Sequence, residues 1–409
     1  MGERIIITEK LLFGTVGWNI AETTRMIEMA KLFKDQYECH FFSYGGQFEE
    51  LVEEAGFILH RLAPREGPEK IEHLWKIDRG ESFKQPWSYD EIKQRIFEEI
   101  KLIEQIKPVS AFLGSVLTFS LSCRLTGTLL FNIIPLALSR PYLEANLPVS
   151  PFWPKWLNRI GAWLLLNLPL LLGNVRKAAR DFGLPKPRTF LELWEGDINI
   201  VAETRELSLL KKLPEGWYFS GPLFAHLKNP IPPEVQQLLL EKGKTKIYFA
   251  MGSSANRGIL LKTLAAFKGL NVAVIAPIKS HLKPGDRIPK NVLVTNWLPA
   301  LEVTQRVDIA VIHGGQGTVQ TTVSAGVPFL GIGMQPEQDL NIYLYQKFGN
   351  AVQLSRSKLT ERKIAEALQL IMSDSNYRQK AKEAQSILNG VNTGEIINII
   401  FSEHLSEKS

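Results

Sequence analysis

Short apolar runs alternate with amphipathic segments along the first half of the chain. The apolar runs predict buried strands, and the segments between them have the 3.6-residue spacing of helices. The predicted strands are residues 4–8 (RIIIT), 38–44 (ECHFFSY) and 57–62 (FILHRL), and the predicted helices are residues 21–35, 48–56 and 90–106. This order of strand, helix and strand predicts a parallel sheet connected by crossover helices.

The same alternation starts again in the second half. The predicted strands are residues 246–251, 271–277, 292–297, 307–313 and 327–333, with helices between them, and residues 360–389 are helical and charged. Residues 221–245 are rich in proline and read as a linker. We therefore predict an α/β fold class with two doubly wound, Rossmann-like domains, residues 1–225 and residues 226–409.

Composition excludes several classes of protein. The chain has 409 residues, of which 45% are hydrophobic and 22% charged, as in ordinary globular domains. Its two cysteines, Cys39 and Cys123, are too few for a disulfide framework or a four-cysteine zinc site and fit a reducing compartment. The start of the sequence lacks the apolar region of a secretory signal, and no uncharged apolar run is long enough to span a bilayer. We expect a cytoplasmic protein.

The net charge of +6 is concentrated in one window, residues 145–191. The window holds Lys155, Arg159, Arg176, Lys177, Arg180, Lys186 and Arg188, with Asp181 as its one acidic residue. It also holds three tryptophans and the run LLLNLPLLLG. This combination fits peripheral binding to an anionic membrane surface. The alternative is a buried helix hairpin with a solvated basic rim. Nucleic acid is not an expected partner, because no RNA-binding aromatic motif or zinc spacing accompanies the charge.

A glycine-rich turn follows the predicted strand at residues 307–313. It reads His313-Gly-Gly-Gln-Gly-Thr318, and we expect a helix to begin at Gly317 or Thr318. Glycines let a phosphate approach the backbone, and the N–H groups and dipole at a helix start favour negative charge. The turn therefore predicts a phosphate site, with a tight structural turn as the alternative for the glycines and a structural role as the alternative for His313.

Four linked elements resemble a known family. They are Trp297-Leu-Pro299, the glycine-rich turn at 313–318, Ala-Gly-Val-Pro at 325–328, and Pro-Glu-Gln-x-x-Asn at 336–341. Their order resembles the donor-sugar motif of nucleotide-sugar glycosyltransferases with the GT-B fold, especially the bacterial macrolide-, rhamnolipid- and sterol-type enzymes. The resemblance implies two domains facing across a cleft. The first would bind the acceptor and the second the nucleotide sugar, with a last helix at about 392–405 crossing back to the first domain.

The resemblance also implies roles for individual residues. His313, Gly315, Gly317 and Thr318 would hold the diphosphate, Trp297 would lie by the nucleobase, and Glu337 and Gln338 would bind sugar hydroxyls. Ser253 and Ser254 would face the phosphates, with a helix N-cap as the alternative. A polar loop before a helix is the alternative for Glu337 and Gln338. Where relatives carry a glutamine and a glutamate that contact the nucleoside, this chain has Ala300 and Thr321, so UDP- and dTDP-linked donors both stay open.

A general base is needed to deprotonate the acceptor hydroxyl. The family places a histidine or aspartate at the start of its first helix, and the matching position here is Glu22, followed by Arg25, which could orient it. The alternative is a glutamate that complements the helix dipole.

Motifs of rival chemistries are missing from the sequence. It contains no P-loop, Asp-x-Asp pair, His-Glu-x-x-His, Cys-x-x-Cys, Gly-x-Ser-x-Gly or dinucleotide fingerprint. We therefore predict an inverting, metal-independent glycosyltransferase that uses a UDP- or dTDP-linked sugar and no other cofactor. Its acceptor would be hydrophobic, a lipid or natural product, because residues 111–172 are apolar. A sugar-nucleotide epimerase or hydrolase, or a non-catalytic nucleotide-sugar-binding relative, are the alternatives.

Overall fold

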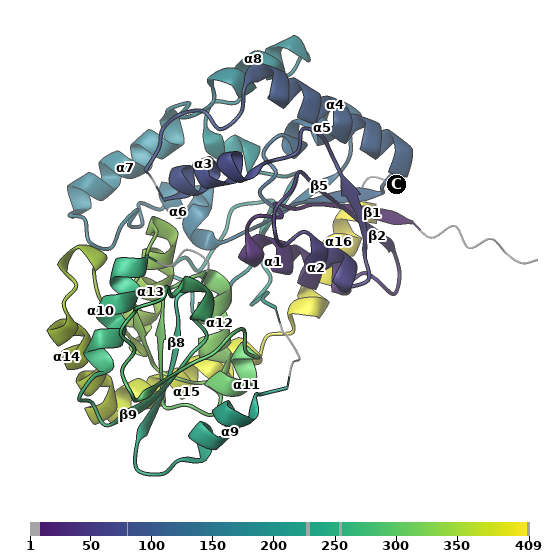
Figure 1. The fold of residues 1–409 in the computed structure, drawn as a ribbon. Helices are drawn as coiled ribbons and strands as arrows, with labels where there is room; N and C mark the ends of the chain where they lie inside the picture. Colours follow the sequence, from purple (N-terminus) through teal and green to yellow (C-terminus); the bar gives the residue numbers. More distant parts are fainter. Residues whose placement is uncertain (1–8, 80, 226–229, 253–255, 407–409) are drawn as a thin grey trace, which may run out of the picture.

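The two halves of the chain form two separate parallel β-sheets in the structure, a computed structural model that describes residues 9–79, 81–225, 230–252 and 256–406. The first sheet has the strand order β3-β2-β1-β4-β5-β6-β7, and the second has the order β10-β9-β8-β11-β12-β13. Helices cover the sheets in both halves (Figure 1). The predicted α/β class with two doubly wound units is confirmed.

The strands are short and separated by helices or loops, as the sequence pattern predicts. They are β1 (Lys10–Gly14), β2 (Glu38–Ser43), β3 (Ile58–Arg61), β4 (Ser110–Leu113), β5 (Leu130–Ile134), β6 (Ile198–Val201), β7 (Trp217–Phe219), β8 (Thr245–Ala250), β9 (Val272–Ala276), β10 (Val292–Val294), β11 (Ile309–Ile312), β12 (Phe329–Gly331) and β13 (Ala351–Gln353).

The α-helices of the first half are α1 (Ile20–Lys31), α2 (Glu50–Glu54), α3 (Pro68–Asp78), α4 (Tyr89–Ile106), α5 (Phe119–Thr126), α6 (Arg140–Glu144), α7 (Lys155–Asn167) and α8 (Gly173–Asp181). Those that follow are α9 (Pro233–Leu240), α10 (Arg257–Phe267), α11 (Ala300–Thr304), α12 (Gln316–Ser324), α13 (Pro336–Phe348), α14 (Glu361–Ser373), α15 (Ser375–Asn389) and α16 (Thr393–Ser406). Short 3₁₀ helices lie at Leu136–Leu138, Phe190–Leu193, Lys279–His281 and Arg356–Lys358.

Two boundaries differ from the sequence prediction, and one predicted strand is not tested. The strand predicted at residues 4–8 lies outside the described residues, and the first described strand is β1, which starts at Lys10. The predicted linker contains helix α9, because its paired prolines start a helix whose Val235 and Leu239 are buried in the second core. Helix α12 begins at Gln316, one residue earlier than predicted.

A row of phenylalanines forms the centre of the first core. Phe41, Phe13, Phe112 and Phe131 occupy matched positions on the adjacent strands β2, β1, β4 and β5, with ring centroids 4.6–5.2 Å apart. Phe401 of α16 lies over this row, 5.3 Å from Phe131. The last helix of the chain therefore packs on the first sheet, where Figure 1 shows it beside β1 and β2.

Each sheet has one point where the direction of strand addition reverses. In the first sheet it lies between β1 and β4, and in the second between β8 and β11. Loops that leave the carboxyl ends of two such strands run to opposite sides of the sheet and leave a site for ligands. Glu22 follows β1 and His313 follows β11, so the candidate residues belong to these two positions.

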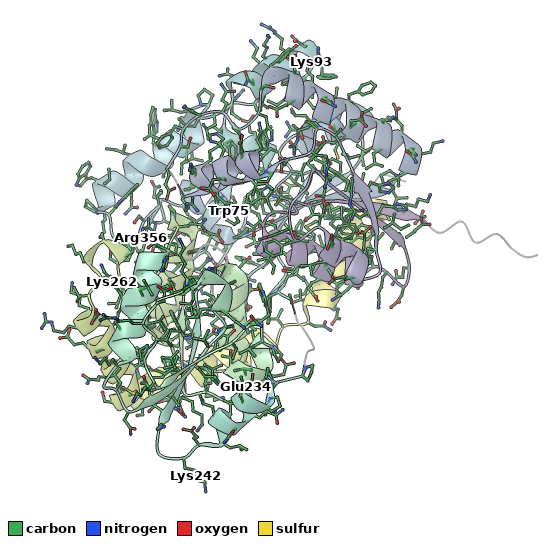
Figure 2. The ribbon with its side chains drawn as sticks, in the orientation of Figure 1. Trp75, Lys93, Glu234, Lys242, Lys262 and Arg356 are labelled. Atoms are coloured by element: carbon green, nitrogen blue, oxygen red, sulfur yellow. The ribbon has the colours of Figure 1, made fainter. Side chains whose placement is uncertain are left out.

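The two halves contact each other directly. Gln316 and Gln320 of α12 donate from their Nε2 atoms to the carbonyl oxygen of Ala202, at 3.1 and 2.7 Å. Leu340 of α13 is buried in a cluster with Leu136 of the first half. Trp75 of α3 lies on the side of the first half that faces the second (Figure 2). The carboxyl-end loops of both sheets are therefore held close together.

Candidate active site

Glu22 is held at the start of α1 by two hydrogen bonds to its carboxylate. The Asn19 side chain caps the helix by accepting from the N–H of Ala21 at 3.0 Å, which fixes the first turn. The carboxylate then accepts from Nη1 of Arg25 at 2.9 Å and from Oγ of Ser115 at 3.1 Å. One oxygen is bound to each partner, so the carboxylate has a fixed orientation, as a general base requires.

Ser115 is a site residue that the sequence analysis missed. It follows β4, on the other side of the reversal point from Glu22, and its φ of +61° lies in the left-handed region. A non-glycine residue in this region costs about 1 kcal/mol or more, and such strain is concentrated at functional sites. The position directly after the carboxyl end of β4, beside β1, is the signal that would have identified it.

His313 is packed between two glycines at the end of β11. A Cβ atom on Gly252 would lie 2.5 Å from its Nε2 atom, and one on Gly315 would lie 2.6 Å from the same atom. Burial lowers the pKa of His313 to about 4. The ring is therefore neutral near pH 7 and can act on a ligand through a hydrogen bond rather than through a positive charge.

The N-terminus of α12 faces no capping side chain among the described residues. Gly315 is the N-cap residue, and Gly317 and Thr318 in the first turn are partly exposed. Among the described residues, a Cβ atom on Gly317 would meet only one heavy atom within 4 Å, at 3.9 Å. Within this part of the chain the first turn of α12 thus borders open space, an arrangement that suits an anion at the positive end of the helix dipole.

The segment at 336–341 is tied to the glycine-rich turn. Asn341 donates from Nδ2 to the carbonyl oxygen of Gly314 at 3.0 Å and to Oε1 of Glu337 at 3.3 Å. Gln338 accepts from the N–H of Met334 at 2.9 Å and donates to Gln335 at 2.6 Å. The amide of Gln338 therefore bonds within the protein, while Glu337 is positioned beside the glycine-rich turn.

Five charged residues meet where the halves contact each other, and we call them the junction cluster: Glu22, Arg25, Asp78, Glu203 and Glu337. Burial raises the pKa of Glu337 to about 7. The positive charge of Arg25 lowers this pKa, and the negative charges of Asp78 and Glu22 raise it further. Burial also raises the pKa of Glu203 to about 7, with a contribution from Glu337. Three carboxylates, those of Glu22, Glu203 and Glu337, lie near the buried guanidinium of Arg25, and burial favours the protonated form of Glu203 and Glu337.

Asp78 connects the junction cluster to the second half. Its carboxylate accepts a hydrogen bond from the side chain of Gln335, the residue that precedes α13. More than a third of the surface of Asp78 is exposed, although neighbouring residues crowd its carboxylate. Desolvation by this surrounding protein raises the pKa of Asp78 to about 6, and the charge of Glu22 adds to the effect. No motif in the sequence indicated this residue.

Comparisons with known proteins agree with this geometry. The family described as "Erythromycin biosynthesis protein CIII-like, C-terminal domain" matches residues 260–399, which include the glycine-rich turn and α13. The chain is 26% identical over 398 residues to a PGL/p-HBAD biosynthesis glycosyltransferase of Mycobacterium tuberculosis, covering 93% of this chain and 89% of the relative. Spinosyn forosaminyltransferase SpnP has a similar solved structure, with a TM-score of 0.71 at 14% identity, covering 97% of this chain and 99% of that one.

The chain has the GT-B fold, and its similarity to these enzymes supports glycosyltransferase activity. A second solved structure, glycosyltransferase VinC in complex with dTDP, has a TM-score of 0.69 at 14% identity and covers 98% of this chain and all of that one. The resemblance carried by the four linked motifs is thus confirmed, and so is the enzymatic class.

Other predicted donor residues of this glycosyltransferase have different outcomes. Ser253 and Ser254 lie outside the described residues, although the adjacent Gly252 contacts His313. Trp297 is 65% exposed in the loop between β10 and α11. Strand β10 is three positions from β11, or about 14 Å, at the same edge of the sheet. The indole is therefore available for a flat ligand, and its role stays a prediction.

Two further findings concern the described part of the glycosyltransferase. It contains no group of three or more His, Cys, Asp or Glu side chains arranged to hold a metal ion. Within the same ranges, no helix combines the length and apolar character needed to cross a bilayer.

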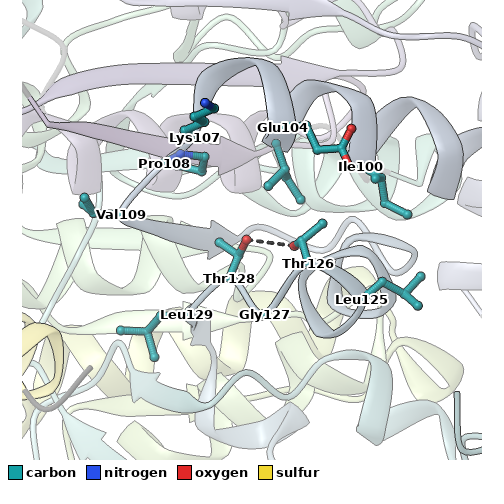
Figure 3. A pocket seen from close by; sticks show the side chains of 11 residues that line it. Ile100, Glu104, Lys107, Pro108, Val109, Leu125, Thr126, Gly127, Thr128 and Leu129 are labelled. Atoms are coloured by element: carbon teal, nitrogen blue, oxygen red, sulfur yellow. Dashed lines mark hydrogen bonds between the residues drawn. The ribbon is translucent and has the colours of Figure 1, made fainter. Parts of the chain in front are cut away.

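A hollow of about 600 Å³ lies far from the junction cluster, between α4 and the loop that connects α5 to β5. Figure 3 shows Lys107, Pro108 and Val109 on one side of it, and Thr126 and Thr128 on the other. These residues precede β4 and β5, so the hollow is at the amino ends of the strands. Ligands of such sheets bind at the opposite edge, and we do not assign the reaction to this hollow.

Proposed function

We propose that this glycosyltransferase moves a hexosyl group from a UDP- or dTDP-linked sugar to a hydroxyl group of a hydrophobic lipid or natural-product acceptor, with inversion at the anomeric carbon. The catalytic base is Glu22, and the diphosphate is bound by the first amides of α12, with Thr318 and the neutral ring of His313 as further hydrogen-bonding groups. The proposal needs no metal ion, because the helix N-terminus supplies positive potential.

One structural observation carries the proposal. The charge of Glu22 acts on Glu337 across the junction and raises its pKa, and Asn341 links Glu337 to Gly314 of the turn at 313–318 by hydrogen bonds. The proposed base of the first half and the proposed phosphate site of the second would thus lie near each other, beside the reversal points of the two sheets. Transfer between two substrates needs this proximity of two binding sites.

The proposed step balances as a direct displacement. The acceptor oxygen forms a bond to the anomeric carbon while its proton passes to Glu22. The bond between that carbon and the diphosphate oxygen breaks, and the nucleoside diphosphate leaves with the electron pair. The amides of α12 and Thr318 stabilise the negative charge that develops on the leaving group. Glu337 would hydrogen-bond a hydroxyl of the sugar being transferred.

The substrate classes are supported by the names of similar proteins. VinC was solved with dTDP, SpnP is a forosaminyltransferase, and a PGL/p-HBAD biosynthesis rhamnosyltransferase of Mycobacterium bovis is 26% identical to this chain over 390 residues. These names support a nucleotide-linked deoxysugar or hexose and an acceptor from a glycolipid or natural-product pathway. A hydrophobic acceptor of this kind is often held in a membrane, so the proposal includes peripheral association with an anionic membrane surface.

The test is a Glu22→Gln variant compared with Glu28→Gln on the same helix. Nucleotide release from UDP- and dTDP-sugars is measured with and without a panel of phenolic and lipid acceptors, and donor binding is measured by calorimetry. Loss of the base should lower turnover by about two orders of magnitude or more and leave donor affinity nearly unchanged. Glu28→Gln, which loses only a surface pair with Lys31, should keep turnover.

Four results would contradict the proposal. Full turnover by Glu22→Gln would remove this residue from the mechanism. Nucleotide release that is equally fast without any acceptor would indicate a hydrolase or epimerase. Nucleotide binding without turnover on any donor and acceptor pair would indicate a non-catalytic relative. Retention rather than inversion, read from the anomeric proton coupling of the product, would exclude direct displacement.

A further inference from the structure

Helix α7 exposes an apolar face that no described part of the chain covers. Trp156, Ile160 and Trp163 follow the i, i+4, i+7 spacing, which places them on one side of the helix. Trp156 is 63% exposed and Trp163 is 56% exposed. Two exposed tryptophans on one helix face are a contiguous patch of the kind that marks an interaction surface.

The loop before α7 extends this face and is fixed to the helix. Asn158, which is buried, accepts from the N–H of Ser150 at 2.8 Å and donates to the carbonyl oxygen of Trp153 at 3.0 Å. The Trp153 ring lies over Gly161, where a Cβ atom would be 3.2 Å from the ring. Phe152 and Trp153 are nevertheless 43–44% exposed. The apolar face is therefore a preformed surface rather than a set of loose side chains.

The basic residues next to this face favour an anionic membrane as its partner. Lys155 and Arg159 are exposed on α7, which carries no acidic residue, and residues 145–191 hold seven basic residues against one acidic residue. Tryptophans flanked by lysine and arginine fit the boundary between the headgroups and acyl chains of an anionic bilayer. Helix α7 has 13 residues and is about 20 Å long, so it is too short to span a bilayer and would lie in its plane.

The inner side of α7 is connected to the junction cluster. Ala162 is buried in the same cluster as Leu136 of the first half and Leu340 of α13. The backbone N–H of Leu136 donates to Oε1 of Glu203 at 3.1 Å. One packed layer thus connects α7 with Glu203 of the junction cluster.

We propose that α7 and the loop at 150–154 form a membrane-binding face that lies flat on an anionic bilayer and places the junction cluster beside acceptors held there. In Figure 1, α7 lies at the outer edge of the first half, away from β1 and α16. The proposal rests on the proposed function only for the identity of the acceptor, because membrane binding itself needs neither donor nor acceptor.

The test is sedimentation of the full chain with vesicles. One set is phosphatidylcholine, and in the other about a third of the lipid is phosphatidylglycerol, which supplies the negative surface potential. The unaltered chain should bind the anionic set at least about tenfold more tightly. The double variants Trp156→Ser with Trp163→Ser, and Lys155→Glu with Arg159→Glu, should each lose about tenfold or more of this affinity.

Matched controls alter the same residue types elsewhere. Phe97→Ser removes a 62% exposed aromatic ring from α4, and Lys242→Glu with Lys244→Glu reverses two exposed charges in the second half, where Lys242 lies far from α7 (Figure 2). Both controls should bind vesicles like the unaltered chain. Unchanged thermal melting of each variant establishes that it is folded.

Several outcomes would overturn this inference. Vesicle binding that the α7 variants leave intact would place the membrane contact elsewhere, and no binding to either vesicle set would exclude it. A dimer in light scattering that Trp156→Ser with Trp163→Ser converts to a monomer would assign the face to a second copy of the chain. Transfer to a water-soluble acceptor, measured in parallel, separates failure of membrane binding from failure of the proposed chemistry.

Discussion

Replacement of Gly317 by alanine should stabilise the folded protein and weaken nucleotide binding. Gly317 is the second residue of α12, and a Cβ atom there would lie 3.9 Å from the nearest heavy atom, Cβ of Phe224, without a clash. Alanine is favoured over glycine in a helix by up to about 1 kcal/mol, and less in the first turn. The free energy of unfolding should therefore rise by several tenths of a kcal/mol.

The same methyl group would project into the open space at the N-terminus of α12. If a diphosphate binds there, the methyl group displaces it from one or two backbone N–H groups. A hydrogen bond to a charged group contributes about 1.5–3 kcal/mol, so the affinity for UDP or dTDP should fall by about one to two orders of magnitude. The two effects have opposite signs, which excludes general damage to the fold as their common cause.

The measurements are urea unfolding and isothermal titration with UDP and dTDP. Gly394→Ala is the matched control, since Gly394 is also the second residue of a helix, α16, and its Cβ would make an ordinary contact at 3.4 Å. It should share the gain in unfolding free energy and keep full nucleotide affinity. Wild-type affinity in Gly317→Ala would refute the placement of the diphosphate at this helix.

Two further predictions test the junction and the core. The pKa of Glu337 is raised from 4.5 to about 7, so its contribution to stability is complete at pH values below the lower value and is lost as pH rises through the higher one. Glu337→Gln should therefore flatten the fall in unfolding free energy between about pH 5 and pH 8, and an unchanged slope in urea titrations would contradict this assignment. Phe401→Ala should lower the unfolding free energy by about 3–5 kcal/mol, measured in urea, because it removes a buried ring from the first core. A loss below about 1 kcal/mol would show that α16 adds little to that core.

Local patterns were sufficient to predict the strands and the donor motif. Residues 271–277 form a nearly continuous apolar run, which is the pattern of a buried parallel strand, and β9 lies within this run. The turn at 313–318 was recognised because its glycines, its strand and its helix are adjacent in the sequence.

The partners of these residues were not predictable in the same way. Asp78 and Gln335 are 257 positions apart, and Ser115 meets Glu22 across 93 positions. No periodicity relates such pairs, since Ser115 and Glu22 meet only when the first sheet has formed, and Asp78 and Gln335 meet only when the two halves pack together. The exposure of α7 was equally hidden, because an apolar helix has the same sequence pattern whether it is buried or solvated.

The ring of Phe401 over the phenylalanine row has a consequence for how this enzyme is made. The first half of the chain leaves the ribosome before α16 has been synthesised. Until then, the phenylalanine row of the first sheet lacks the ring of Phe401 that covers it. Only α16, which follows the whole second half, supplies the missing cover. Cutting the chain at the linker would consequently yield an amino-terminal fragment that lacks part of its own core, and an exchange of this half between enzymes would need to carry α16 with it.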